Sequence, residues 1–215
     1  MKDAGTAQPF ARVYLVRHGE TQANREGVIQ GQLDTALNAA GVRQAGRLAD
    51  ALRCAGVKFD VAYSSDLGRA LETARIILGH RGDVEIVEQA ELRERFMGDL
   101  QGKKANHEVR FAPGVQGTLE TTGAFAARAV KWWKRAILQR TLALPPRDDR
   151  TAYNVLVATH GGLIGTLLDA LLGSGKARCV EGVVVGTGCA NASVTIVEVG
   201  RDRRGVIVLY GGWST

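Results

Sequence analysis

Hydrophobic residues along this chain form two recurring patterns, short apolar runs and longer stretches with helical spacing. A continuous apolar run is typical of a parallel β-strand, because helices cover both faces of such a strand. Runs of this kind predict seven strands, at residues 13–16, 59–63, 84–87, 153–158, 183–185, 193–199 and 206–210.

Helical spacing fills several of the intervals between these runs. From Asn38 to Ala55, apolar residues recur every three or four positions, with charged residues elsewhere around the cylinder. This spacing predicts an amphipathic helix. The same pattern predicts further helices across residues 67–78, 119–139 and 163–171.

Two features refine the predicted helices. Ser64, Ser65 or Asp66 can cap the helix that follows the second apolar run, since their side-chain oxygens accept bonds from free backbone N–H groups. In the 119–139 helix, the spacing of Trp132 and Trp133 predicts that at least one of them packs into the core.

Strands that alternate with helices are typical of an α/β fold. We therefore expect a three-layer α/β/α sandwich with a mostly parallel central sheet. The length of 215 residues fits a single domain over residues 1–215. Residues 1–10 are expected to be a loose tail, and the polar, glycine-rich segment 95–118 is expected to form an irregular cap at a pocket mouth.

Composition narrows the classes of partner and compartment. The net charge is +6, but the arginines are scattered without interleaved aromatics, so no nucleic-acid partner is expected. No apolar run approaches the roughly 20 residues that span a bilayer, so no membrane partner is expected. Three cysteines without pairing pattern predict reduced thiols and a cytoplasmic location. A monomer and a homodimer both stay open.

Candidate chemistry lies where three predicted strands end. Arg17 and His18 directly follow the first strand, Arg69 lies in the first turn after the second, and His160 follows the 153–158 strand. In open α/β sheets, ligands collect beyond the carboxyl ends of the strands. If these strands are neighbours, the four side chains converge on one pocket.

Such a pocket would suit a phosphoryl group. The guanidinium of arginine is a charged planar fork that matches phosphate oxygens. The helix N-termini at Gly161 and near Arg69 add backbone donors, and the glycines Gly19 and Gly161 let the backbone approach a ligand closely. Positive charge nearby would also lower the pKa of His18 and keep its imidazole nucleophilic.

A leaving alkoxide needs a proton from a general acid. Glu94 is the preferred candidate, within a charged stretch at 91–95. Glu20, beside His18, is better suited to holding the loop. The sequence has no zinc or calcium ligand pattern and no Gly-rich phosphate loop followed by lysine. We therefore expect metal-independent chemistry without a cofactor.

Together these residues resemble the signature of the histidine phosphatase superfamily, also called the phosphoglycerate mutase-like family. The resemblance covers nearly the whole chain and implies a phosphoglycerate mutase-like fold. It is carried by Leu15-Val16-Arg17-His18-Gly19-Glu20-Thr21, Asn24, Gln30-Gly31, Tyr63-Ser64-Ser65-Asp66-Leu67, Arg69-Ala70, Thr73-Ala74, Leu92-Arg93-Glu94-Arg95 with Met97-Gly98, and Ala158-Thr159-His160-Gly161-Gly162.

The resemblance also implies roles for these residues. His18 would attack phosphorus and become phosphohistidine, and Glu94 would protonate the leaving oxygen and then activate water. The equatorial oxygens would be held by Arg17, Arg69 and His160, assisted by Asn24 and the Gly161 N–H. Further substrate-binding candidates at the pocket mouth are Gln30, Gly31 and Arg95.

Both mutases and phosphatases belong to this family. The interval between Glu94 and His160 is shorter than the resemblance implies for mutases, and Phe96 and Met97 depart from the mutase pattern. These features favour a metal-independent phosphomonoesterase for sugar phosphates or phosphoglycerates, similar to broad-specificity and fructose-2,6-bisphosphatase-like members. A cofactor-dependent phosphoglycerate mutase and a non-catalytic phospho-ligand-binding module stay open as alternatives.

Overall fold

One seven-stranded sheet forms the centre of the computed structural model, which describes residues 8–79, 84–106, 114–147, 151–186 and 188–213. Its strand order is β3-β2-β4-β1-β6-β7-β5. The strands are β1 Ala11–Arg17, β2 Val61–Ser64, β3 Ile86–Glu88, β4 Tyr153–Thr159, β5 Ala177–Cys179, β6 Val194–Val199 and β7 Gly205–Gly212.

The sheet is mixed but mostly parallel, as predicted. Parallel pairs join β1 to β4, β4 to β2, β2 to β3 and β5 to β7, whereas β6 runs antiparallel to both β1 and β7. Ala158 of β4 lies opposite Val16 of β1 and Ser64 of β2. The carboxyl ends of these three strands are therefore level with one another.

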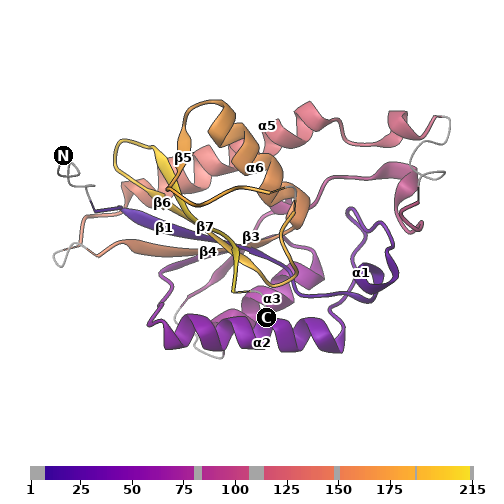
Figure 1. The fold of residues 1–215 in the computed structure, drawn as a ribbon, viewed down its shortest axis with the longest axis horizontal. Coiled ribbons are helices and arrows are strands. Elements are labelled where there is room, and N and C mark those ends of the chain that lie inside the picture. Colours follow the sequence, from indigo (N-terminus) through magenta and orange to yellow (C-terminus); the bar gives the residue numbers. More distant parts are fainter. Residues whose placement is uncertain (1–7, 80–83, 107–113, 148–150, 187, 214–215) are drawn as a thin grey trace.

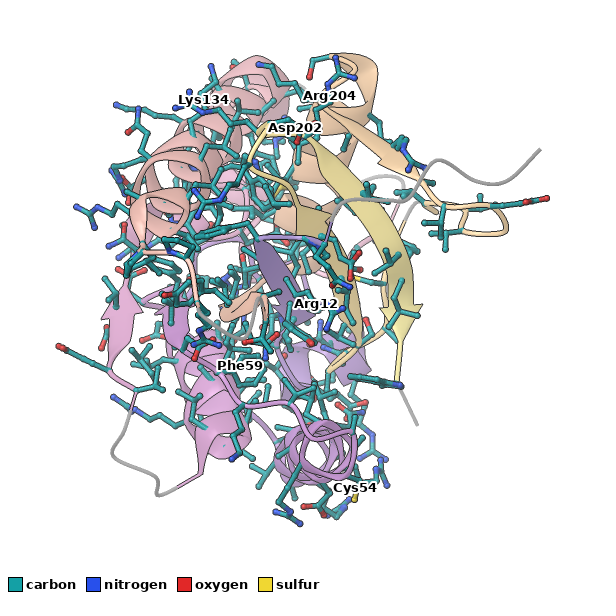
Figure 2. The ribbon with its side chains drawn as sticks, turned by 90° about the vertical axis from the view of Figure 1, so that its left-hand side faces the viewer. Arg12, Cys54, Phe59, Lys134, Asp202 and Arg204 are labelled. Atoms are coloured by element: carbon teal, nitrogen blue, oxygen red, sulfur yellow. The ribbon has the colours of Figure 1, made fainter. Side chains whose placement is uncertain are left out.

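Helices cover both faces of the sheet and complete the predicted three layers. In Figure 1, α2 and α3 lie below the sheet and α5 and α6 lie above it; Figure 2 shows the same layers from the end where Arg12 lies. The α-helices are α1 Gln22–Glu26, α2 Ala39–Cys54, α3 Gly68–Leu78, α5 Thr122–Trp133 and α6 Gly161–Gly173. Shorter turns are η1 Ala90–Leu92, η2 Gly98–Leu100, η3 Val115–Thr118, the π-helical η4 Lys134–Arg140 and η5 Thr141–Ala143.

The apolar run in β1 is explained by these two helical layers. Val13 and Leu15 belong to the core cluster that includes residues of α5 and α6, whereas Tyr14 and Val16 belong to the cluster that includes residues of α2 and α3. Successive residues of a strand point to opposite faces of the sheet. All four side chains are buried because a helical layer covers each face. In α5, both tryptophans are buried, which confirms the predicted core position.

The prediction of a strand at residues 183–185 is wrong. Val184 is 81% exposed, and the edge of the sheet is formed by β5 instead. Val183 and Val185 pack against the core without joining a strand. Their apolar character therefore reflects side-chain burial, which a run of three residues cannot distinguish from strand pairing.

The predicted cap of α3 is also wrong. The N-cap is Leu67, which makes no side-chain cap bond, and the Gly68 N–H donates to Asp34 Oδ1 at 2.7 Å. Asp34 comes from a distant loop, so this cap depends on tertiary structure. Ser65, one of the predicted caps, lies beside His160 instead.

The predicted irregular segment and tail are described only in part, because residues 1–7 and 107–113 lie outside the described residues. Phe10 bonds to the sheet, since its N–H donates to Val199 O at 2.9 Å. Lys104 pairs with Val28 in an isolated bridge, which connects the 95–106 segment to the loop after α1. Over the described ranges, the helices are too short or too polar to cross a membrane.

Candidate active site

Two histidines meet at the carboxyl ends of neighbouring strands. His18 directly follows β1, His160 directly follows β4, and their ring centroids are 5.2 Å apart. Arg17 is the last residue of β1, and Arg69 lies in the first turn of α3, which follows β2. The two histidines and two arginines predicted from the sequence therefore lie together at the carboxyl ends of the central strands.

The ring of His18 is held in one tautomer. Its Nδ1 lies 2.7 Å from the carbonyl oxygen of Gly19, and a carbonyl only accepts, so Nδ1 carries the proton and Nε2 keeps its lone pair. Burial, followed by the positive charge of Arg69, lowers the pKa of His18 to about 3. The imidazole is thus neutral near pH 7, with a free electron pair on Nε2.

His160 is oriented by a serine hydroxyl. Its Nε2 lies 3.0 Å from Ser65 Oγ, and the Leu67 N–H donates to the same hydroxyl at 3.3 Å. We assign the Ser65 hydroxyl as the donor and His160 Nε2 as the acceptor of this bond, so the proton of the neutral ring lies on Nδ1. Complete burial, followed by the charges of His18 and Arg69, holds the pKa of His160 well below its usual value. His160 is therefore a neutral donor.

Both arginines are fixed by backbone carbonyls. Arg69 is 1% exposed and donates to Leu33 O at 2.6 Å and to Gly31 O at 2.8 Å. Arg17 donates to Cys189 O at 2.6 Å. Burial lowers the pKa of Arg69 to about 10, so it is still a cation at neutral pH. Carbonyls orient these guanidinium groups but do not neutralise their charge.

Three buried donors of this cluster have no protein partner. Among the described side chains, the buried polar atoms without a partner are Arg17 Nε, Arg69 Nε, His160 Nδ1 and Trp132 Nε1. Buried donors without partners are costly, and an anion with several oxygens would accept from the first three. Over the same part of the chain, no group of His, Cys, Asp or Glu is arranged to hold a metal ion. The donor set therefore fits a phosphoryl group.

Glu94 lies at the same end of the sheet, beyond the carboxyl end of β4. Its Oε2 accepts from the Gly162 N–H at 2.9 Å, at the start of α6, and its Oε1 accepts from the Arg95 N–H at 2.8 Å. The backbone oxygen of Glu94 accepts from Gln32 Nε2 at 3.1 Å. Because α6 begins directly after His160, these bonds bring a carboxyl group to the histidine pair.

The loop after His18 is fixed by two helices. The Gly19 N–H donates to Thr73 Oγ1 of α3 at 3.0 Å, and the Glu20 N–H donates to Gln44 Oε1 of α2 at 2.8 Å. The Glu20 carboxylate accepts from Asn38 Nδ2, at the N-cap of α2. Glu20 thus holds the loop, as expected from its position.

Two of the predicted binding residues have well-defined amide oxygens. Asn24 Oδ1 accepts from the Thr21 N–H and from Asn191 Nδ2, both at 3.2 Å. Gln30 is 8% exposed, and its Oε1 lies at hydrogen-bond distance from the hydroxyls of Thr21 and Thr35. In both residues the oxygen faces protein donors, and Asn24 comes close to the His18 loop through Asn191.

The other predicted binding residues have different surroundings. Gly31 lies behind Arg69 and contacts it through its carbonyl. Arg95 donates from Nε to Glu120 O at 2.7 Å, so a protein carbonyl already occupies this nitrogen. Gly161 is the first residue of α6 and adjoins His160. Of these three, Gly161 is the one beside the histidine pair.

Sequence reasoning assigned no role to several residues that support the site. Thr73 joins the Gly19 N–H to Arg69 O, and Asn191 donates to His18 O at 3.0 Å. Arg128 donates to three backbone carbonyls around Glu94. A usable signal existed for Arg128, which is a charged residue on the apolar face of the predicted helix. Asn191 had no comparable signal.

The family of this chain follows from comparison with known proteins. Residues 13–211 match the family model described as "Histidine phosphatase superfamily (branch 1)". The chain belongs to this superfamily, as its motifs predicted.

Similar proteins carry the names of phosphoglycerate mutase-like proteins and of phosphatases. "Phosphoglycerate mutase-like protein 4" of Arabidopsis thaliana is 34% identical over 208 residues, which are 95% of this chain and 86% of the relative. A broad-specificity phosphatase of Saccharomyces cerevisiae is 29% identical over 204 residues, 92% of this chain and 83% of the relative. A mycobacterial glucosyl-3-phosphoglycerate phosphatase, solved with VO3, is similar in structure, with a TM-score of 0.73 at 29% identity, covering 94% of this chain and 98% of that one.

Proposed function

We propose that this chain is a metal-independent phosphomonoesterase that acts on small phosphorylated metabolites through a phosphohistidine at His18. The observation that supports this most strongly is the set of three buried, partnerless donors around a neutral His18 whose Nε2 is free. Two arginine cations supply positive charge that a metal ion supplies in other phosphoryl-transfer sites.

In the first step, His18 Nε2 attacks phosphorus on the side opposite the ester oxygen. The P–N bond forms as the P–O bond breaks, and Glu94 in its protonated form gives its proton to the leaving alkoxide. The Nδ1 proton stays on the ring, where Gly19 O stabilises the positive charge that develops. The donors of Arg17, Arg69 and His160 hold the three equatorial oxygens.

In the second step, water replaces the departed alcohol. Glu94, now ionised, takes a proton from this water, and the hydroxide oxygen forms a bond to phosphorus as the P–N bond breaks. The electron pair returns to His18 Nε2, and inorganic phosphate is released. Glu94 regains its proton, so the cycle balances without a further reactant.

The substrate class is supported by the family and by the relatives. A phosphatase of glucosyl-3-phosphoglycerate has a similar structure, and a broad-specificity phosphatase is a relative over most of the chain. Transfer to water, as opposed to a second hydroxyl, is favoured by the short interval between Glu94 and His160. We therefore place sugar phosphates and phosphoglycerates first among the candidate substrates.

Turnover of p-nitrophenyl phosphate at mildly acidic pH tests the nucleophile. His18→Ala should lower kcat by about a thousandfold or more, because it removes the nitrogen that attacks phosphorus. Acid-labile, base-stable phosphate should be trapped on the wild type and be absent from the variant. Equal turnover by both proteins would contradict the role of His18, and loss of activity with a chelator would contradict metal independence.

Phosphorus NMR with 3-phosphoglycerate separates the phosphatase from the mutase. A phosphatase should release inorganic phosphate faster than it forms the 2-isomer. The reverse order would establish the mutase alternative. Binding of phosphate without turnover of any ester would establish the non-catalytic binding module.

A further inference from the structure

We infer that Arg128 is a positioning residue that holds the general acid Glu94 in place for its proton transfer. This inference rests on the proposed function, because it concerns the acid of that reaction. Arg128 lies on α5, and its hydrogen bonds reach the backbone around Glu94 and not the rings of His18 and His160. Its positive charge also acts at longer range, because it contributes to the lowered pKa of His160. A variant that keeps the charge, Arg128→Lys, separates this long-range effect from the effect of the bonds around Glu94.

The guanidinium of Arg128 gathers the backbone of the acid-bearing segment. Nη1 donates to Glu91 O and to Arg93 O, both at 2.8 Å, and Nη2 lies 3.3 Å from Glu94 O. One planar group thus contacts three carbonyls within four consecutive residues. A fork of fixed geometry that bonds three points of a loop leaves that loop little freedom to turn.

Glu120 fixes Arg128 from the other side. Its carboxylate accepts from Arg128 Nε at 3.0 Å and from Nη2 at 2.8 Å, and the two side chains are only 19% and 16% exposed. The same carboxylate accepts from the Phe96 N–H at 3.1 Å, and the Glu120 carbonyl accepts from Arg95 Nε. A half-buried bidentate pair of this kind is more rigid than a surface ion pair.

Arg128, held by Glu120, forms a clamp on the backbone of residues 91–94, and this clamp helps to fix the position of the Glu94 carboxyl group. Its carbonyl is held by Arg128 and Gln32, and its carboxylate is held by the N–H groups of Arg95 and Gly162. Without the clamp, the backbone carbonyls lose their donors and the segment relaxes. A general acid must lie within hydrogen-bond reach of the leaving oxygen, so a small displacement lowers the rate of proton transfer.

Leaving-group dependence separates this role from a merely structural one. Phenyl phosphate and p-nitrophenyl phosphate are similar in shape, but phenolate needs a proton from the acid far more than p-nitrophenolate does. Rapid-quench measurement of phosphoenzyme formation should show that Arg128→Met raises the rate ratio of p-nitrophenyl to phenyl phosphate about tenfold. Glu94→Gln gives the reference ratio for complete loss of the acid.

Arg135 offers a matched control. It follows α5 in the same helical segment and bonds to Glu91 Oε1 at 2.7 Å, but only through side chains. Arg135→Met removes an ion pair with the same segment while leaving the carbonyl contacts of Arg128 intact. It should keep the wild-type rate ratio, and an equal rise in this control would overturn the inference.

Arg128→Lys keeps the charge and removes the fork, and it carries the test if Arg128→Met does not fold. It should also raise the ratio, whereas a wild-type ratio in a folded Arg128→Lys would overturn the inference. Failure of the proposed function is distinguishable, because wild type would then form no phosphoenzyme from either ester. A phosphoenzyme in wild type, a raised ratio in Glu94→Gln and an unchanged ratio in the Arg128 variants would overturn only the role of Arg128.

Discussion

At the scale of single residues, burial gives the cluster a neutral imidazole and positive charge without an ionic partner among the described residues, the two properties that the proposed reaction needs. Burial keeps His18 neutral by lowering its pKa, so its Nε2 lone pair is available. The same burial leaves Arg69 as a cation whose bonded partners are neutral carbonyls. A charge in such surroundings gains more from a bound anion than an exposed charge does, because water screens it less. Arg69 should therefore contribute strongly to oxyanion binding.

Arg69→Met should weaken the binding of orthovanadate, an analogue of the phosphoryl group. Loss of a buried charged partner costs about 2–5 kcal/mol, so we expect Kd to rise about 30-fold or more. At 100 times the wild-type Kd, ligand should stabilise wild type by about 2.7 kcal/mol, but a variant whose Kd is raised about 100-fold by only about 0.4 kcal/mol. Thermal unfolding with increasing orthovanadate measures this difference.

Arg12 is a suitable control for that experiment. It bonds to Glu198 at the opposite end of the sheet, where Figure 2 labels it. Arg12→Met also removes one positive charge, but the stabilisation by orthovanadate should stay as in wild type. Equal losses in both variants would mean that net charge, rather than the bonds of Arg69, determines binding.

At the scale of elements, α2 supports the loop after His18 by direct backbone contact. A Cβ atom on Gly41 would lie 2.1 Å from Glu20 O, and one on Gly19 would lie 2.5 Å from Gly41 O. Asn38 caps the helix by accepting from the Gly41 N–H at 2.8 Å, and its Nδ2 donates to Glu20. The start of α2 and the loop after His18 therefore cannot separate without losing both the cap and the loop contact.

Gly41→Ala should disturb this contact and its consequences for the site. The new methyl group meets backbone, which cannot rotate away, so we expect a loss of about 1–3 kcal/mol in the free energy of unfolding. Displacement of the His18 loop should lower kcat/KM about tenfold or more. Urea unfolding and p-nitrophenyl phosphate kinetics measure the two effects.

Gly46, in the interior of the same helix, provides the comparison. A Cβ atom there meets nothing within 4 Å, so Gly46→Ala should raise the free energy of unfolding by about 0.5–1 kcal/mol through helix propensity. Its kcat/KM should be unchanged. Wild-type activity in a destabilised Gly41→Ala would show that the contact supports the fold alone.

At the scale of the whole molecule, the sequence was sufficient for the features that depend on local pattern. The apolar runs at 13–16 and 153–158 lie within β1 and β4, and His18 and His160 directly follow these strands. The meeting of the two histidines then followed from the rule that functional residues of an open α/β sheet gather beyond the carboxyl ends of its strands. The histidine and arginine cluster could be anticipated because each member lies beside a strand end that the sequence itself marks.

Features that depend on contacts between distant segments could not be anticipated. Asp34 caps α3 from another loop, and the fork of Arg128 bonds carbonyls more than thirty residues away. The three-residue run at 183–185 packs its side chains inward without pairing. Each of these depends on where a second segment lies, and the pattern of one segment contains no information about that.

The stability of the whole molecule should also depend on pH through the two buried histidines. The unfolded pKa of histidine is 6.5, and burial lowers that of His18 to about 3. Between these values the unfolded chain binds more protons, so the free energy of unfolding is fully present above pH 6.5 and falls as the pH is lowered. One such histidine removes about 2 kcal/mol between pH 6.5 and 4.5. The pKa of His160 is shifted in the same direction, and its contribution adds to that of His18.

Urea unfolding at pH 6.5 and 4.5 isolates the contribution of each ring. His18→Asn should lose about 2 kcal/mol less than wild type over this interval, because the unfolded variant has no imidazole there to protonate. His160→Asn should change the pH dependence in the same direction. Carboxylates also titrate in this window, but they are common to all three proteins and cancel in the differences. If the single variants lost as much stability as wild type, the folded-state pKa of the imidazoles would have to equal that of the unfolded chain, and burial would not be what keeps these rings neutral.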